Sequence, residues 1–143
     1  IPQEHEWVKE IDQLVLQTKK TLEVVGHSLG TRAILLYLEK HQVRIRKVIL
    51  IAAFANRVEN AKRRDGKYAS FFDHVIDLEK IKPLVDKFVV IHSQNDALLD
   101  YEQGAEIAKD IGAQLMTYSD QGHFLDLKSG QEILRILRQE LVF

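Results

Sequence analysis

A serine stands between two glycines in the run Gly26-His27-Ser28-Leu29-Gly30. An apolar run, residues 22–25, precedes it and an apolar segment, residues 31–38, follows it, so we expect a strand that turns sharply into a helix. Such a turn strains its central residue, and glycine at both flanking positions removes side chains that would collide with neighbouring backbone. The pattern therefore predicts a nucleophilic Ser28 at the carboxyl edge of a sheet. The alternative is a tight turn with an inert serine.

Catalysis by this serine would require further groups. The positive end of the following helix lies beneath the hydroxyl, so the N–H of Leu29 is expected to donate to an oxyanion developing on a substrate carbonyl. A serine hydroxyl is a weak nucleophile until a base takes its proton, and an acid must orient that base. The chain must therefore bring a histidine and a carboxylate to Ser28.

Two later strands lead into suitable residues. The apolar run 88–91 enters His92-Ser93-Gln94-Asn95-Asp96, and the run 114–118 enters Ser119-Asp120-Gln121-Gly122-His123. Because parallel strands end at one edge of a sheet, Ser28, Asp96 and His123 are expected to meet on one rim.

Other residues compete for the same roles. His27 adjoins Ser28, but adjacent side chains diverge at a sharp turn, so it is expected to pack beneath the turn or to orient a loop. A structural, hydrogen-bonded role is favoured for His92 over contact with substrate, and surface positions suffice for His5, His41 and His74. The alternative acids are Asp100, expected to cap a helix, Asp120, expected in a turn, and Asp126, near the last helix.

Hydrophobic periodicity indicates the elements that position these residues. We expect helices over about 4–20, 29–41 and 101–111, strands over 21–25, 48–54, 88–91 and 114–118, and a final helix through Ile133, Leu134, Leu137 and Leu141. Residues 55–80 lack this hydrophobic periodicity and are expected to form a loop or small lid. This order predicts an α/β fold, a parallel sheet flanked by helices on both faces, in a single domain over residues 1–143.

Composition excludes several classes of function. The chain has 143 residues and a formal net charge of −1, which gives no electrostatic reason to expect nucleic acid or an anionic membrane as partner. Its one basic cluster, at residues 62–67, is interpreted as a solvated loop. Without cysteine, a signal-peptide pattern or an apolar stretch of ~20 residues, a cytoplasmic location is expected. No zinc-ligand spacing occurs, so neither metal nor organic cofactor is expected.

Three motifs together resemble a known family. The Gly26–Gly30 run, the turn Ser93-Gln94-Asn95-Asp96 and the ending Gly122-His123-Phe124 look like the small serine hydrolases of the α/β-hydrolase superfamily, the family of retinoblastoma-binding protein nine. The chain order serine, acid, histidine is that of the superfamily. The resemblance implies Ser28 as nucleophile, Asp96 as acid and His123 as base. Residues 71–73 and 78–82 resemble the family's lid region, and we expect Phe71, Phe72 and Phe124 to contact substrate.

The chain also departs from the family pattern. Asn95 stands where a second aspartate is expected, which leaves the triad acid in place. Leu78 replaces a bulky aromatic residue, so the pocket is expected to be wider or shaped for another substrate. The family's first strand, its Gly-rich oxyanion loop and the following helix are missing, so the fold is expected to be N-terminally incomplete. We expect the second oxyanion donor in that absent segment.

These observations predict a serine hydrolase, carboxylesterase-like or a small peptidase or amidase, that cleaves a small ester, thioester or amide through an acyl-enzyme. Its partner would be a small-molecule acyl substrate. The alternative is a non-catalytic protein-binding module, because a hydrolase fold alone does not establish catalysis. We expect residues 1–143 alone to be aggregated or strand-exchanged, or the absent segment to be supplied by a protein partner, because its loss exposes backbone groups along the edge of the strand over 21–25.

Overall fold

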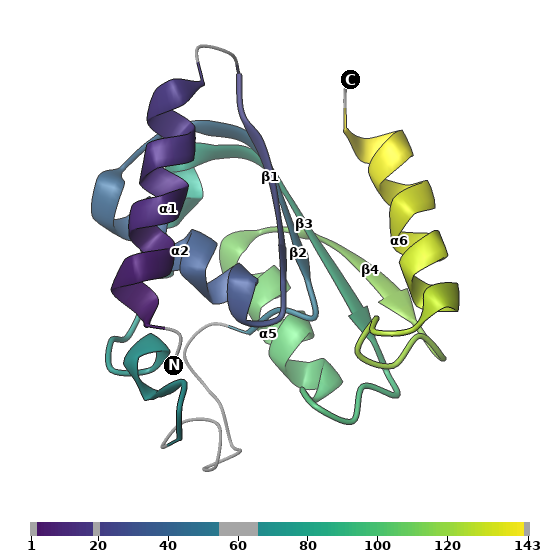
Figure 1. The fold of residues 1–143 in the computed structure, drawn as a ribbon. Coiled ribbons are helices and arrows are strands. Elements are labelled where there is room, and N and C mark those ends of the chain that lie inside the picture. Colours follow the sequence, from purple (N-terminus) through teal and green to yellow (C-terminus); the bar gives the residue numbers. More distant parts are fainter. Residues whose placement is uncertain (1–2, 19–20, 55–65, 142–143) are drawn as a thin grey trace.

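The computed structural model describes residues 3–18, 21–54 and 66–141 (Figure 1). Its longer elements are α1 (Glu4–Gln17), β1 (Glu23–His27), α2 (Leu29–His41), β2 (Ile45–Ile51), β3 (Val85–Ser93), α5 (Tyr101–Ile111), β4 (Gln114–Tyr118) and α6 (Leu127–Glu140). In the described part of the stretch between β2 and β3 lie three short helical segments: η1 (Ala69–Phe71), α4 (Leu78–Ile81) and η2 (Lys82–Leu84).

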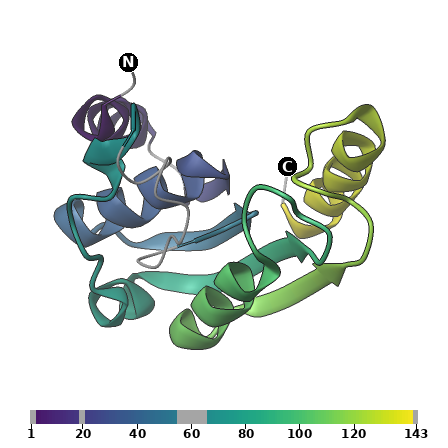
Figure 2. The same cartoon turned by 90° about the horizontal axis from the view of Figure 1, so that it is seen from below.

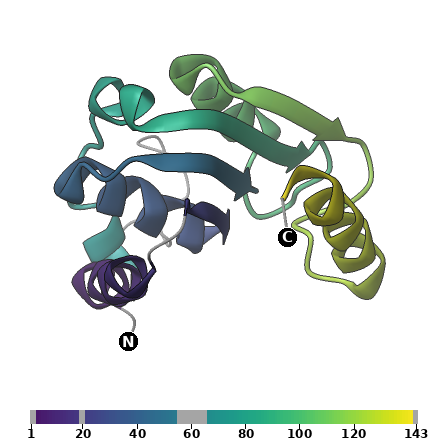
Figure 3. The same ribbon diagram turned by 90° about the horizontal axis from the view of Figure 1, so that it is seen from above.

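The strands form one parallel sheet. Within the described residues their order is β1-β2-β3-β4, and the pairing places Gly26 beside Leu50 and Leu50 beside Val90. Figure 3 shows the ends of β2, β3 and β4 at the same edge of the sheet. Every loop that leaves this edge can therefore contribute to one site.

Helices cover both faces of the sheet, as the sequence predicts. Alternate strand residues divide between two apolar clusters: Val48, Leu50 and Val90 pack with α2 and α5, whereas Ile49 and Val89 pack with α6. Figure 1 shows α2 and α6 on opposite sides of the strands, and Figure 2 shows α1 outside α2. The burial of both faces explains why residues 48–51 of β2 and 88–91 of β3 are continuously apolar.

Several element bounds differ from the sequence prediction. β1 begins later than expected and continues to His27, so it delivers Ser28 without an intervening loop. β2 begins at Ile45, which pairs with Val85, and ends before Ala52, whose φ of 49° leaves the strand conformation. In the expected lid, residues 55–65 lie outside the described residues, and residues 66–80 contain η1 and the start of α4.

Candidate active site

Ser28 has a strained backbone, as the turn requires. Its φ of 53° and ψ of −119° lie in a region that residues with a side chain rarely adopt. Hydrogen bonds hold both sides of the residue: its N–H donates to the Ile51 carbonyl at 2.9 Å, and its carbonyl accepts from the Thr31 N–H at 3.0 Å and the Thr31 hydroxyl at 2.6 Å. These hydrogen bonds to the neighbouring strand and to the first turn of α2 therefore offset the backbone strain.

The two flanking glycines have different reasons to be there. A Cβ at Gly26 would lie 2.6 Å from Cδ1 of Ile34 and 3.0 Å from the Gly30 backbone, so a side chain there would require both neighbours to shift. A Cβ at Gly30 would have no heavy atom within 4 Å. The expectation that both glycines prevent a collision is thus right for Gly26 and wrong for Gly30.

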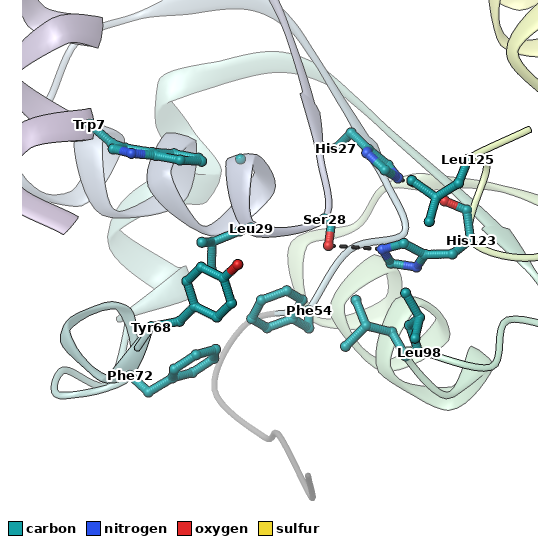
Figure 4. A pocket seen from close by; sticks show the side chains of 12 residues that line it. Trp7, His27, Ser28, Leu29, Phe54, Tyr68, Phe72, Leu98, His123 and Leu125 are labelled. Atoms are coloured by element: carbon teal, nitrogen blue, oxygen red, sulfur yellow. Dashed lines mark hydrogen bonds between the residues drawn. The ribbon is translucent and has the colours of Figure 1, made fainter. Parts of the chain in front are cut away.

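The structure brings Ser28, His123 and Asp96 together in one hydrogen-bonded chain. Nε2 of His123 lies 2.9 Å from Oγ of Ser28 (Figure 4), and Nδ1 of His123 lies 2.7 Å from Oδ2 of Asp96. With the proton on Nδ1, the ring donates to the Asp96 carboxylate and its Nε2 accepts from the serine hydroxyl. The arrangement is that of a nucleophile, a base and an orienting acid.

Asp96 is a buried carboxylate that its neighbours keep ionised. Burial raises the pKa of Asp96, but hydrogen bonds from His123, His92 and the Leu99 and Leu98 backbone outweigh it and hold that pKa well below its usual range. The two backbone N–H groups donate to Oδ1 at 2.9 Å and 2.8 Å, respectively. Oδ2 is thereby left for the imidazole.

A polar network joins the loop that carries Asp96 to the loop that carries His123. Oδ1 of Asn95 accepts from the Ser93 hydroxyl at 2.8 Å and from the Gly122 N–H at 2.7 Å. Oγ of Ser93 in turn accepts from the Gln121 N–H at 2.9 Å. Sequence reasoning missed this role, and the only signal was the position of Asn95 within the acid-bearing motif.

The other two histidines near the site, His27 and His92, contact the residues around Ser28 and His123 but do not contact the serine hydroxyl. Burial lowers the pKa of His27, and its Nε2–H donates to the His123 carbonyl at 2.8 Å, so it orients that loop. His92 is fully buried, with Nε2 3.1 Å from the Leu99 carbonyl and 3.5 Å from Asp96. Neither arrangement places an imidazole against the Ser28 hydroxyl.

The alternative acids are engaged elsewhere. Asp120 binds Lys128 at 2.8 Å, and Asp126 caps α6 by accepting from the Ser129 N–H at 2.7 Å. Asp100 is the N-cap residue of α5, as predicted, but its side chain makes no capping hydrogen bond. Its backbone carbonyl accepts from the Gln103 N–H at 3.0 Å instead.

A cavity of about 450 Å³ opens over Ser28 and His123. Its walls are mainly apolar and come from α1, from the end of β2, and from the loops around η1, after β3 and after β4 (Figure 4). The main apolar contributors are Trp7, Phe54, Tyr68, Phe72, Leu98 and Leu125. Leu29, the first residue of α2, also lines the cavity, and the N–H groups of a first helical turn have no partner within their helix.

Of the three phenylalanines expected to contact substrate, only Phe72 lines this cavity. Phe71 is fully buried, with its ring 5.3 Å from that of Trp7 in an edge-to-face arrangement. Phe124 packs in the cluster on the α6 face, edge-on to Tyr118 at 6.1 Å. The expectation is corrected for Phe71 and Phe124, because adjacent residues in these tight segments point in different directions.

Among the described residues, no group of three or more histidine, cysteine, aspartate or glutamate side chains is arranged to hold a metal ion. In the same part of the chain, no helix has the length and apolarity that a bilayer span requires.

Comparison with known proteins agrees with the geometry. The sequence profile of the family described as serine hydrolase matches residues 1–141. Serine hydrolase RBBP9 of Rattus norvegicus is 29% identical over 123 residues, which is 86% of this chain and 62% of that protein. The putative hydrolase YdeN of Bacillus subtilis is 28% identical over 127 residues, 87% of this chain and 65% of that protein. The chain thus spans less than two thirds of the length of either relative.

Solved structures show the same fold. The ydeN gene product of Bacillus subtilis superposes with a TM-score of 0.78 at 23% identity, covering 97% of this chain and 77% of that one. The esterase EaEST of Exiguobacterium antarcticum gives a TM-score of 0.73 at 15% identity, covering 96% and 73%. The parallel sheet and the serine on its sharp turn define an α/β-hydrolase fold. Within that class, the chain belongs to the serine hydrolase family.

Proposed function

We propose that this protein hydrolyses a small ester, thioester or amide through an acyl-enzyme intermediate, with Ser28 as nucleophile, His123 as base and Asp96 as orienting acid. The observation that supports this most strongly is the pair of contacts at His123, 2.9 Å to the serine oxygen and 2.7 Å to the carboxylate. The strained turn aims the serine into an apolar cavity, where a substrate carbonyl can reach it.

Each step has a named group in this proposal. Oγ of Ser28 attacks the carbonyl carbon as Nε2 of His123 takes the hydroxyl proton. The Asp96 carboxylate stabilises the imidazolium, which then gives the proton to the leaving group as the acyl–leaving group bond breaks. Water repeats the sequence on the acyl-enzyme and releases the acid.

The oxyanion of each tetrahedral intermediate needs hydrogen-bond donors. We propose the N–H of Leu29 as one donor, because it opens α2 directly after Ser28 and Leu29 lines the cavity. The second donor is expected outside the described residues. Removal of a single oxyanion donor typically costs about 10²–10³ in rate, so each donor contributes substantially to such a reaction.

The experiment that tests this proposal traps the acyl-enzyme. The protein is mixed with para-nitrophenyl butyrate, quenched with acid and weighed by intact-mass spectrometry. We expect a butyryl adduct on the wild type and none on Ser28→Ala. Ser119→Ala, which changes an exposed serine near the site, is the matched control and should still be acylated. An adduct that survives in Ser28→Ala contradicts the proposal, and failure of the wild type to acylate or turn over favours a non-catalytic binding module.

A further inference from the structure

The described residues that line the cavity carry no fixed charge. Among the described residues that line it, the ionisable side chains are His27, His123 and Tyr68. Burial lowers the pKa of His27, whose ring is occupied with the His123 carbonyl. A substrate bound here therefore meets no carboxylate, ammonium or guanidinium group from these walls.

The nearest buried charges are turned away from the cavity. Asp96 directs one oxygen to His123 and the other to two backbone N–H groups. Arg32 of α2 donates to the carbonyls of Phe71 and His74, and its guanidinium carbon lies 5.3 Å from the centre of the Phe72 ring. Arg32 thus anchors the segment that supplies Phe72 and does not itself line the cavity.

Proton transfer fixes which part of the cavity receives the acyl group. His123 gives its proton to the leaving group, so the leaving group lies beside His123 and the acyl group on the other side of Ser28. In Figure 4, Tyr68 and Phe72 lie on the side of Ser28 away from His123. The Phe72 ring stacks on Phe54, with centroids 5.6 Å apart and planes 21° apart. We call Phe54, Tyr68 and Phe72 the aromatic lobe.

We propose that the aromatic lobe selects an uncharged, apolar acyl group, alkyl or aryl, and discriminates against acyl groups that carry an α-ammonium or a terminal carboxylate. This inference rests on the proposed acyl transfer at Ser28. Its physical basis is that a charged group placed in the lobe loses its hydration and finds no partner on the described walls. The rejection of such a group is therefore expected to be at least comparable to the effect of one methylene in an apolar pocket, about tenfold or more.

Two matched pairs of para-nitrophenyl esters test the inference on the wild-type chain. Hydrocinnamate and phenylalanine esters differ by the α-ammonium group, and isocaproate and hemisuccinate esters differ by an isopropyl group in place of a carboxylate. The kcat/KM of each ester is divided by its second-order rate constant with hydroxylamine, an external nucleophile, which corrects for differences in the intrinsic reactivity of the ester carbonyl. We expect the charged member of each pair to be at least about tenfold poorer. Equal or better turnover of either charged ester overturns the inference.

A pair of variants places the selection in the lobe. Tyr68→Glu puts a carboxylate on the cavity wall and should bring the phenylalanine ester closer to the hydrocinnamate ester. Val75→Glu adds the same charge at a side chain of the same segment that is 73% exposed and outside the cavity, and should leave the ratio unchanged. An unchanged ratio in a folded Tyr68→Glu, checked by circular dichroism, overturns the assignment to the lobe.

The results separate the inference from the function beneath it. If all four esters acylate Ser28 without preference, the proposed function stands and the selectivity is refuted. If none of the four esters acylates Ser28 or is turned over, the proposed function is refuted, and the inference is refuted with it because it depends on that function. If Tyr68→Glu does not fold, the two matched ester pairs measured on the wild type still test the selectivity.

Discussion

Asp96 is the residue whose environment most clearly serves the proposed chemistry. Burial by itself would neutralise a carboxylate, yet four hydrogen-bond donors hold its pKa below the usual range. It can therefore fix the His123 tautomer and stabilise the imidazolium without taking the proton itself. The same contacts tie its ionisation to the stability of the fold.

We predict that Asp96→Asn leaves the fold intact but lowers kcat by about 10⁴, the size of effect known for this change in a serine protease. The asparagine keeps the shape of the side chain, but it can present an N–H to the imidazole and favour the wrong tautomer. Asp120→Asn is the matched control, because Asp120 pairs with Lys128 on the surface. Ester hydrolysis measures kcat, and circular dichroism checks the fold. An unchanged kcat in Asp96→Asn together with a strongly lowered kcat in Asp120→Asn would show that the acid is misassigned.

The pKa of Asp96 also predicts how stability depends on pH. Because the folded-state pKa lies below the unfolded value of about 3.9, its contribution to stability is present above that value and is lost as pH falls toward the folded pKa. Urea denaturation of wild type and Asp96→Asn should therefore give free energies of unfolding that converge in acid. Parallel pH profiles for the two proteins would contradict the assignment of a lowered pKa.

At the scale of the elements, the loops after β3 and β4 act together through Asn95. Asn95→Ala removes the acceptor shared by Ser93 and Gly122 and should lower kcat by up to about 10² with little change in KM, because a small misplacement of His123 impairs proton transfer. Gln94→Ala, at an exposed neighbour, is the control.

A conservative change at the same position separates positioning from mere stability. Asn95→Asp keeps an acceptor for both donors and should restore most of kcat. It adds a negative charge near His123, which already faces Asp96 and His27, so the acid limb of the pH–rate profile should move to higher pH. An Asn95→Ala with normal kcat, or an Asn95→Asp with an unmoved profile, argues against this role.

Sequence patterns predicted those elements whose periodicity is set by burial. The bounds of α2, α5 and β4 were predicted correctly, and the proximity of Ser28, Asp96 and His123 was expected from the strand ends and the family motifs. The burial of Phe71 away from the cavity that Phe72 lines was not predictable, since a short 3₁₀ segment has no repeating pattern to show which ring faces the cavity. The Asn95 network was missed because it exists only once two distant loops meet.

At the scale of the whole molecule, β1 is the exposed edge of the sheet. Within the described residues it pairs with β2 alone, and a groove of about 640 Å³ lies between it and α1, lined by side chains such as Ile11, Val15 and Val24. Val25 on this strand is 38% exposed. An apolar strand edge of this kind is a template for pairing with another chain.

We therefore predict that the 143-residue chain associates through β1, as aggregates or strand-exchanged oligomers. Val25→Lys should reduce association, since a charge on an edge strand opposes pairing, whereas Val75→Lys on an exposed loop should not. Sedimentation velocity checks both. A wild type that sediments as a monodisperse monomer of 16.5 kDa would contradict the prediction.

The most direct test of the account is the site of covalent labelling by a fluorophosphonate, which reports an activated serine without requiring a known substrate. After labelling, digestion and peptide mass spectrometry locate the adduct. We predict a single phosphonylated residue, Ser28, with labelling abolished in Ser28→Ala and slowed in Asp96→Asn. An adduct at Ser93 or Ser119, or undiminished labelling of Ser28→Ala, would contradict the central claim that Ser28 is the nucleophile.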